Sequence, residues 1–149
     1  MTASQNALFV GESQAGDEHE HPPGVGIARL IEHSLRNHGY NPNPINNWRD
    51  CGWSIDFSMN GGAFEISLAS TAETNLWMLQ IACTNRPGML ARLLGRRSVD
   101  HADDIHKIAF TVHQTLQSNG YTDLRWCLDG YPDDGGSNPE PLPPIGKAT

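Results

Sequence analysis

The sequence predicts an α+β domain in which a mainly antiparallel sheet of about four strands carries two main helices on one face. Two observations predict this class. Two segments have apolar residues at helical spacing, and four others have alternating or continuous apolar residues typical of strands. The strands follow one another instead of alternating with helices, which disfavours a doubly wound parallel sheet.

Composition divides the 149-residue chain into three parts. We expect residues 1–23 to be a flexible acidic tail and residues 129–149 a flexible tail rich in Pro, Gly and Asp. Neither part has enough apolar side chains to offset the entropy lost on ordering, although the run Ala7–Val10 could be a small docking strand. Residues 24–128 are expected to form a single α+β domain.

The first expected helix covers residues 25–38. Ile27, Leu30, Ile31 and Leu35 follow the 3.6-residue spacing of a buried stripe. Gly39 suits the helix end because glycine accepts a left-handed conformation at little cost. The prolines that follow predict a loop.

Three expected strands come next along the chain. Residues 53–59 alternate between apolar and polar side chains, the turn Asn60-Gly61-Gly62 predicts a hairpin, and residues 64–68 alternate again. Residues 76–84 are apolar on both faces, so this third strand is expected to be central or covered.

The second main helix is expected at residues 103–119, with Asp103 and Asp104 at its positive end. The fourth strand follows at residues 124–128. Both helices end in Gly-Tyr after similar apolar stripes. This echo indicates either an internal duplication or two helices that obey the same packing and capping rules, and we favour the second interpretation because the segments after each Gly-Tyr differ.

The segment 86–97 concentrates positive charge in a chain of net charge −7. It reads RPGMLARLLGRR and contains no acidic residue. We expect a short helix at residues 89–96 whose leucines face inward, leaving guanidinium groups outside to make forked hydrogen bonds with carboxylate or phosphate. The alternative is an ordinary amphipathic connector. The predicted partner-binding residues are Arg86, Arg92, Arg96, Arg97 and Trp48.

The loop Trp48–Trp53 is the alternative site. Cys51 there could act as a nucleophile activated by Arg49, with Asp50 beside it, if a histidine came within reach. A structural thiol is the competing interpretation. The odd number of cysteines, Cys51, Cys83 and Cys127, favours reduced thiols in the cytoplasm over a disulfide framework.

The sequence offers few signs of a bound metal or cofactor. His106 and His113 lie two turns apart on one face of the second helix, and His101 and Asp103 lie near its start. Their spacing lacks the HExxH pattern of a metal site, and we expect a surface or boundary role. The acidic, histidine-containing residues 17–21 lie in the expected tail. We therefore predict no metal ion and no cofactor.

These observations favour a protein-binding module, of the adaptor, chaperone or immunity-protein type, over an enzyme. The expected partner is a protein with an acidic surface that meets the arginine segment. A small enzyme or ligand binder using the Cys51 loop is one alternative. Phosphate or nucleic-acid binding is another, which the formally neutral central part disfavours. No apolar run is long enough to span a membrane.

Overall fold

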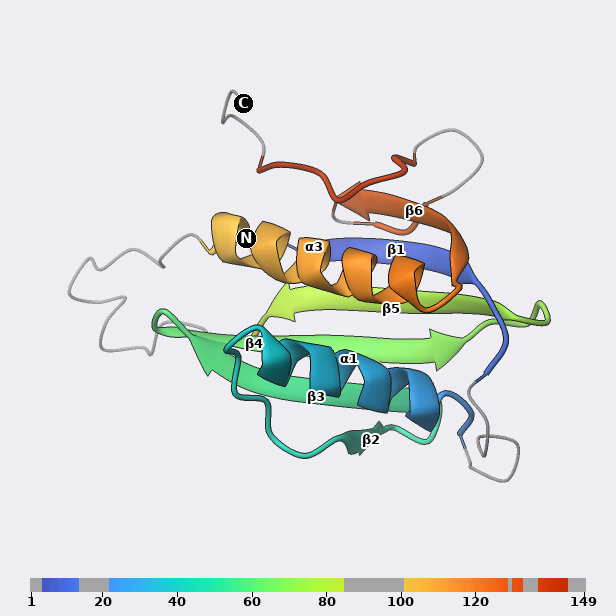
Figure 1. Cartoon of the computed structure of the whole chain (residues 1–149), viewed down its shortest axis with the longest axis horizontal. Coiled ribbons are helices and arrows are strands. Elements are labelled where there is room, and N and C mark those ends of the chain that lie inside the picture. The colour runs from blue at the N-terminus through green and yellow to red at the C-terminus, as the bar shows by residue number, and fades with distance from the viewer. Residues whose placement is uncertain (1–3, 14–21, 85–100, 129, 133–136, 145–149) are drawn as a thin grey trace.

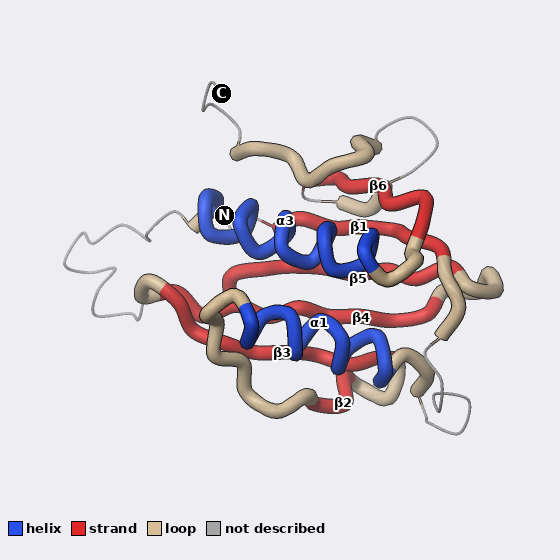
Figure 2. Tube along the Cα trace, in the orientation of Figure 1, coloured by secondary structure: helices blue, strands red, loops and turns tan. Residues whose placement is uncertain are grey.

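The computed structural model describes residues 4–13, 22–84, 101–128, 130–132 and 137–144. These residues form an α+β fold with two helices on one face of a six-stranded sheet (Figures 1 and 2). The elements are β1 (Ser4–Val10), α1 (Val25–Asn37), β2 (Asn46–Trp48), β3 (Gly52–Met59), β4 (Gly62–Ser70), β5 (Leu76–Cys83), α3 (Ala102–Ser118) and β6 (Thr122–Leu128).

All neighbouring strands of the sheet run antiparallel, in the order β2-β3-β4-β5-β1-β6. The predicted class is confirmed, but the predicted number of strands was too small. The four predicted strands correspond to β3, β4, β5 and β6, and the sheet adds β1 and β2. In the described part of the chain, no helix is long and apolar enough to cross a membrane.

β1 corrects the expectation that the whole N-terminal part is a tail. It lies between β5 and β6, and its register pairs Ala7 with both Leu79 and Trp126. Ala7 and Phe9 are fully buried beneath the helices. The docking-strand signal in residues 7–10 therefore outweighs the polar composition around it, because non-local pairing on two sides supplies the burial that the segment alone lacks.

The core lies between the sheet and the two helices. α1 buries Val25, Ile27, Ala28, Ile31 and Leu35, as its helical periodicity predicts. α3 buries Ile105, Ile108, Ala109, Val112 and Leu116 along its own stripe. The largest side chain enclosed is Trp126 on β6, with no exposed surface.

The two helices end alike. Gly39 and Gly120 have φ values of 87° and 89°, and the amides of the tyrosines after them bond back to Leu35 and Leu116 at 3.0 and 3.1 Å. These are the bonds of a left-handed helix cap. The equivalent residues Ser34 and Thr115 share a hydrogen bond between the helices.

The C-terminal part is also built into the fold. Trp126 and Asn138 exchange two backbone hydrogen bonds, of 2.7 and 2.9 Å. The buried amide of Gln5 bonds to both the carbonyl and the amide of Leu142, at 2.8 and 2.9 Å. Residues 137–144 therefore lie against β6 and β1, contrary to the expectation of a flexible tail.

Candidate functional site

The arginine segment itself lies outside the described residues, and so does the short helix expected at 89–96. Its two flanks are described. Thr84 follows β5, and its amide donates a 2.7 Å hydrogen bond to the carbonyl of Ala63, the second residue of β4. The chain is described again from His101, at the start of α3.

The second flank is held at the same end of the sheet. The His101 imidazole donates from Nδ1 to the Asp104 carboxylate at 3.0 Å, and Asn60 donates to its other oxygen at 3.0 Å. The His101 ring also packs edge-on against Phe64. Both flanks of the arginine segment therefore meet the β3–β4 hairpin.

Hydrogen bonds, and after them nearby charges, favour the ionised form of the Asp104 carboxyl group in this cluster. Burial raises the pKa of Asp104, but hydrogen bonds from His101 and Asn60 and the nearby charges of His101 and Lys107 outweigh it. The pKa therefore lies below the ordinary 3.8. In the described structure His101 pairs with Asp104 within the first turn of α3.

Trp48 occupies the other end of the sheet. It pairs with Gly52 at the start of β3, whereas Asn60 follows the end of β3. At a rise of about 3.3 Å per residue, the two ends of this eight-residue strand are roughly 23 Å apart. The described structure thus does not bring Trp48 next to the flanks of the arginine segment.

The Cys51 loop is a tight exposed hairpin between β2 and β3. Arg49 and Asp50 both have positive φ, of 53° and 59°, and the Asp50 amide bonds to the side chain of Asn47 at 2.7 Å. The Cys51 thiol donates to the carbonyl of Trp48 at 3.2 Å. A nucleophilic cysteine needs an imidazole or another base at that distance, and the contact found is to a carbonyl.

No helix in the described part of the chain covers the face of the sheet opposite α1 and α3 (Figure 2). Leu8, Met78 and Ala69 form one row across β1, β5 and β4. The next row is polar and contains Asn6, Gln80 and Ser67. Alternation along each strand predicts this two-faced pattern, with the inward positions filling the core.

Asn6 in this polar row has an incompletely satisfied side chain. It is 2% exposed and donates from Nδ2 to the carbonyl of Gly130 at 2.7 Å. Its Oδ1 is buried and has no hydrogen-bond partner among the described residues. A buried acceptor of this kind carries a desolvation cost.

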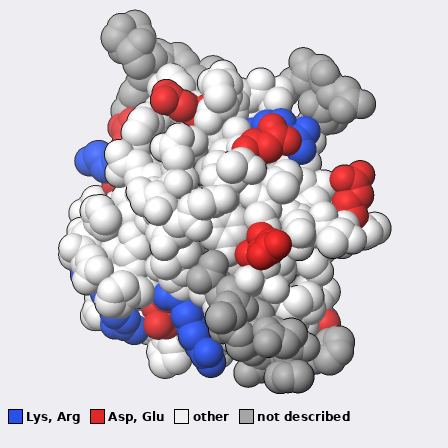
Figure 3. All heavy atoms as spheres, turned by 45° about the vertical axis from the view of Figure 1, so that its right-hand side comes forward, with Lys and Arg blue, Asp and Glu red and all other residues white. Residues whose placement is uncertain are grey.

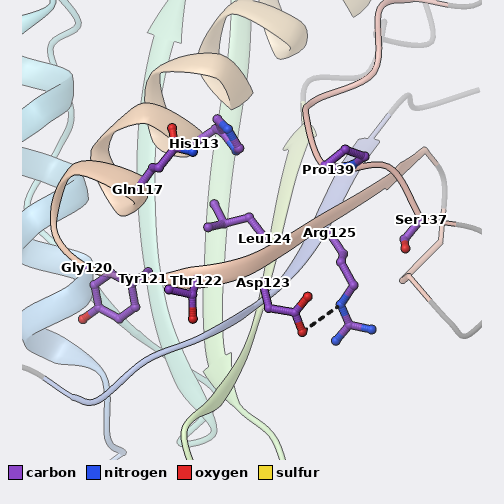
Figure 4. Close-up of a pocket in the computed structure, with 10 residues that line it drawn as sticks. All are labelled: His113, Gln117, Gly120, Tyr121, Thr122, Asp123, Leu124, Arg125, Ser137 and Pro139. Atoms are coloured by element: carbon purple, nitrogen blue, oxygen red, sulfur yellow. Dashed lines mark ion pairs between the residues drawn. The ribbon is translucent and has the colours of Figure 1, made fainter.

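A cleft of about 570 Å³ lies beside β6, between the second half of α3 and residues 137–139 (Figure 4). His113 and Gln117 border it on the helix side, and Asp123 and Arg125 on the other side of β6. No local pattern in the sequence predicts this cleft, because Ser137 and Pro139 in its wall reach β6 only through the tertiary fold.

His113 is held as a neutral side chain in the wall of this cleft. It is 5% exposed, and its Nδ1 accepts a 3.1 Å hydrogen bond from the Trp126 indole. Nδ1 must therefore be unprotonated, so the neutral ring carries its proton on Nε2. Burial lowers the pKa of His113 below the ordinary 6.5, and the charge of Glu140 opposes this only in part.

The described residues contain no group of three or more His, Cys, Asp or Glu side chains arranged to hold a metal ion. On the face shown in Figure 3, acidic and basic side chains are scattered and much of the surface is uncharged. Comparisons with protein-family models, curated proteins and solved structures found no match.

Proposed function

We propose that the protein is a non-enzymatic protein-binding module of the adaptor, chaperone or immunity-protein type. Its partner presents carboxylates to Arg86, Arg92, Arg96 and Arg97. The observation that supports this proposal is the attachment of both flanks of the arginine segment to the β3–β4 hairpin, through Thr84 and through Asp104. The chain leaves and rejoins the described structure at one end of the sheet.

The chemistry of the segment supports an anionic partner. Guanidinium groups make paired hydrogen bonds to carboxylates, and the segment has no acidic residue of its own to compete for them. Trp48 remains in the proposal as a second, separate contact at the opposite end of β3. We place the protein in the cytoplasm, because Cys51, Cys83 and Cys127 are free thiols.

Charge reversal tests the proposal. The variant Arg92→Glu/Arg96→Glu is compared with Arg29→Glu/Lys107→Glu, which changes the net charge equally at exposed positions of α1 and α3. Binding is measured by titration with polyglutamate, and by co-purification of the tagged full-length chain from its source cells. We expect the first variant to lose both signals and the control to keep them. Equal behaviour of the two variants would contradict the proposal.

The two alternatives have distinct outcomes in solution. If the segment recognises phosphate, a short DNA duplex binds in place of polyglutamate, with an affinity that falls steeply as salt increases. If Cys51 is a nucleophile, an alkylating probe labels it faster at pH 7 than it labels an unstructured peptide thiol. Labelling at the peptide rate would contradict the enzyme alternative.

A further inference from the structure

The C-terminal segment, residues 137–144, crosses from the outer edge of β6 to β1, the next strand of the sheet (Figure 1). Asn138 pairs with Trp126 at the edge of β6, and Leu142 bonds to the side chain of Gln5 on β1. Gln5 points to the side of the sheet that carries the helices, as the buried residue two positions later does. The segment therefore reaches the helix-bearing side of the sheet at this edge.

The hydrogen bonds that join this segment to the two strands are made by its backbone. The N–H of Asn138 donates to the Trp126 carbonyl at 2.9 Å, and its carbonyl accepts from the Trp126 N–H at 2.7 Å. The Gln5 amide donates to the Leu142 carbonyl at 2.8 Å and accepts from the Leu142 N–H at 2.9 Å. These four bonds do not depend on which side chains the segment has at the two positions.

Prolines occupy positions between these bonds. Four of the eight residues are prolines, and Pro139 and Pro141 lie between Asn138 and Leu142. A proline has no N–H, so these positions bring no unpaired donor to the surface that they cover. The fixed φ of proline also keeps a free peptide extended, which lowers the entropy lost on binding. Pro141 is buried, so its ring is a side chain that fills the site.

The segment is held by few contacts. Among residues 137–144 only Pro141 is buried. Ser137 and Pro139 stand in the wall of the cleft beside β6, so solvent reaches this side of the segment (Figure 4). A segment attached so lightly exchanges between bound and released states, and a second segment of the same chemistry competes for its place.

We propose that the backbone of Trp126, the side chain of Gln5 and the surface beneath Pro141 form a binding site for an extended, proline-containing segment of a partner protein. We call it the segment site, and residues 137–144 occupy it as an internal competitor. The partner's segment follows the pattern of residues 138–142. It has prolines at the second and fourth positions, and residues with an N–H at the first and fifth.

A separate partner is favoured over a second copy of this chain. The resident segment is tethered beside its own site at an effective concentration of about millimolar or more. The identical segment of a second copy has the same intrinsic affinity and no tether, so it has no advantage over the resident one. A partner's segment can instead bind more tightly through its own flanking residues. This inference does not depend on the arginine segment.

Titration of the full chain with a synthetic peptide of residues 137–144 tests the segment site. Pro141→Asp places a charge where the proline ring is buried and should release the resident segment. The variant should bind the peptide about tenfold or more tightly than the wild type, in which only the molecules with an empty site can bind. Pro143→Asp, at an exposed position of the same segment, is the matched control and should bind like the wild type. Isothermal titration calorimetry measures the three dissociation constants.

Changes at the recognising atoms give an independent result. N-methylation of the leucine in the peptide removes the N–H that Gln5 accepts. It should weaken binding to the wild type and to Pro141→Asp alike, by about fivefold or more. Adding Gln5→Ala to Pro141→Asp should weaken binding by a similar factor, whereas adding Gln80→Ala should not. Circular dichroism confirms that each variant is folded.

Three results would overturn the inference. The first is a peptide that fails to bind Pro141→Asp at millimolar concentration, and the second is equal affinity of Pro141→Asp and Pro143→Asp. The third comes from sedimentation equilibrium of the wild type. A dimer that excess peptide dissociates would mean that two copies exchange the segment, which contradicts a separate partner. Arg92→Glu/Arg96→Glu should leave the peptide affinity unchanged, because the arginine segment forms no part of this site.

Discussion

The indole of Trp126 donates a hydrogen bond to Nδ1 of His113, 3.1 Å away, and both side chains are buried. This contact joins the middle of α3 to β6, and the Trp126 backbone in turn holds Asn138. One histidine in the wall of the cleft thus connects a helix, an edge strand and the C-terminal segment.

The stability of the protein should decrease in mild acid because of His113. Burial lowers the pKa of His113 in the folded state below 6.5, so the unfolded chain binds a proton more readily. This contribution to the free energy of unfolding is complete above pH 6.5 and is lost as the pH falls through the folded pKa. Urea unfolding of the wild type at pH 7.5 and pH 5 should show the decrease.

The variant His113→Phe should separate this effect from those of the other histidines. It removes the acceptor of the indole N–H, which should cost about 1–3 kcal/mol at pH 7.5. The difference in unfolding free energy between wild type and variant should then shrink toward pH 5. If the difference stays constant with pH, the titration of His113 does not affect stability.

Gln5 should hold the C-terminal segment on the sheet. The variant Gln5→Ala removes both hydrogen bonds to Leu142, which should cost about 1–3 kcal/mol. Hydrogen exchange in residues 137–144 should become faster, while exchange in β4 changes little. Gln80→Ala is the matched control. Gln80 lies on β5 and on the face of the sheet opposite to that of Gln5, so exchange in the C-terminal segment should stay unchanged.

Asp104 should contribute to stability above its lowered pKa. Its contribution is complete above pH 3.8 and is lost as the pH falls through the folded pKa, because the unfolded chain then binds the proton more readily. Asp104→Asn should lower the free energy of unfolding by about 1 kcal/mol at pH 6 and reduce the acid dependence below pH 4. Asp50→Asn, at an exposed hairpin, is the control and in the same urea titrations should change the free energy of unfolding at pH 6 by no more than about 0.5 kcal/mol.

Gly52 should tolerate no side chain. A Cβ at this position would lie 2.0 Å from the carbonyl oxygen of Leu68, in the neighbouring strand β4. Gly52→Ala should lower the free energy of unfolding by about 1–3 kcal/mol, since the backbone of β3 or β4 must move. A Cβ at Gly130 meets open space, so Gly130→Ala should stay within about 0.5 kcal/mol of the wild type by thermal unfolding.

The sequence alone determined the elements whose signals are local. The apolar stripes of α1 and α3, the glycines at 39 and 120 and the alternation in β3, β4 and β6 all predict what the structure contains. The Asn60-Gly61 turn has two positive φ angles, as the hairpin signal requires. Each of these signals depends only on neighbours within one or two turns of chain.

Tertiary structure decided the features that depend on distant partners. β1 is a strand because β5 and β6 accept it on either side, and the three-residue β2 exists by pairing with β3. Asp104 bonds to Asn60, and Gln5 to Leu142, across 44 and 137 positions of sequence. The cleft at β6 has Ser137 and Pro139 of the C-terminal segment in its wall. Burial and pairing between segments far apart in the chain supply the free energy for these features, and composition within one segment does not record it.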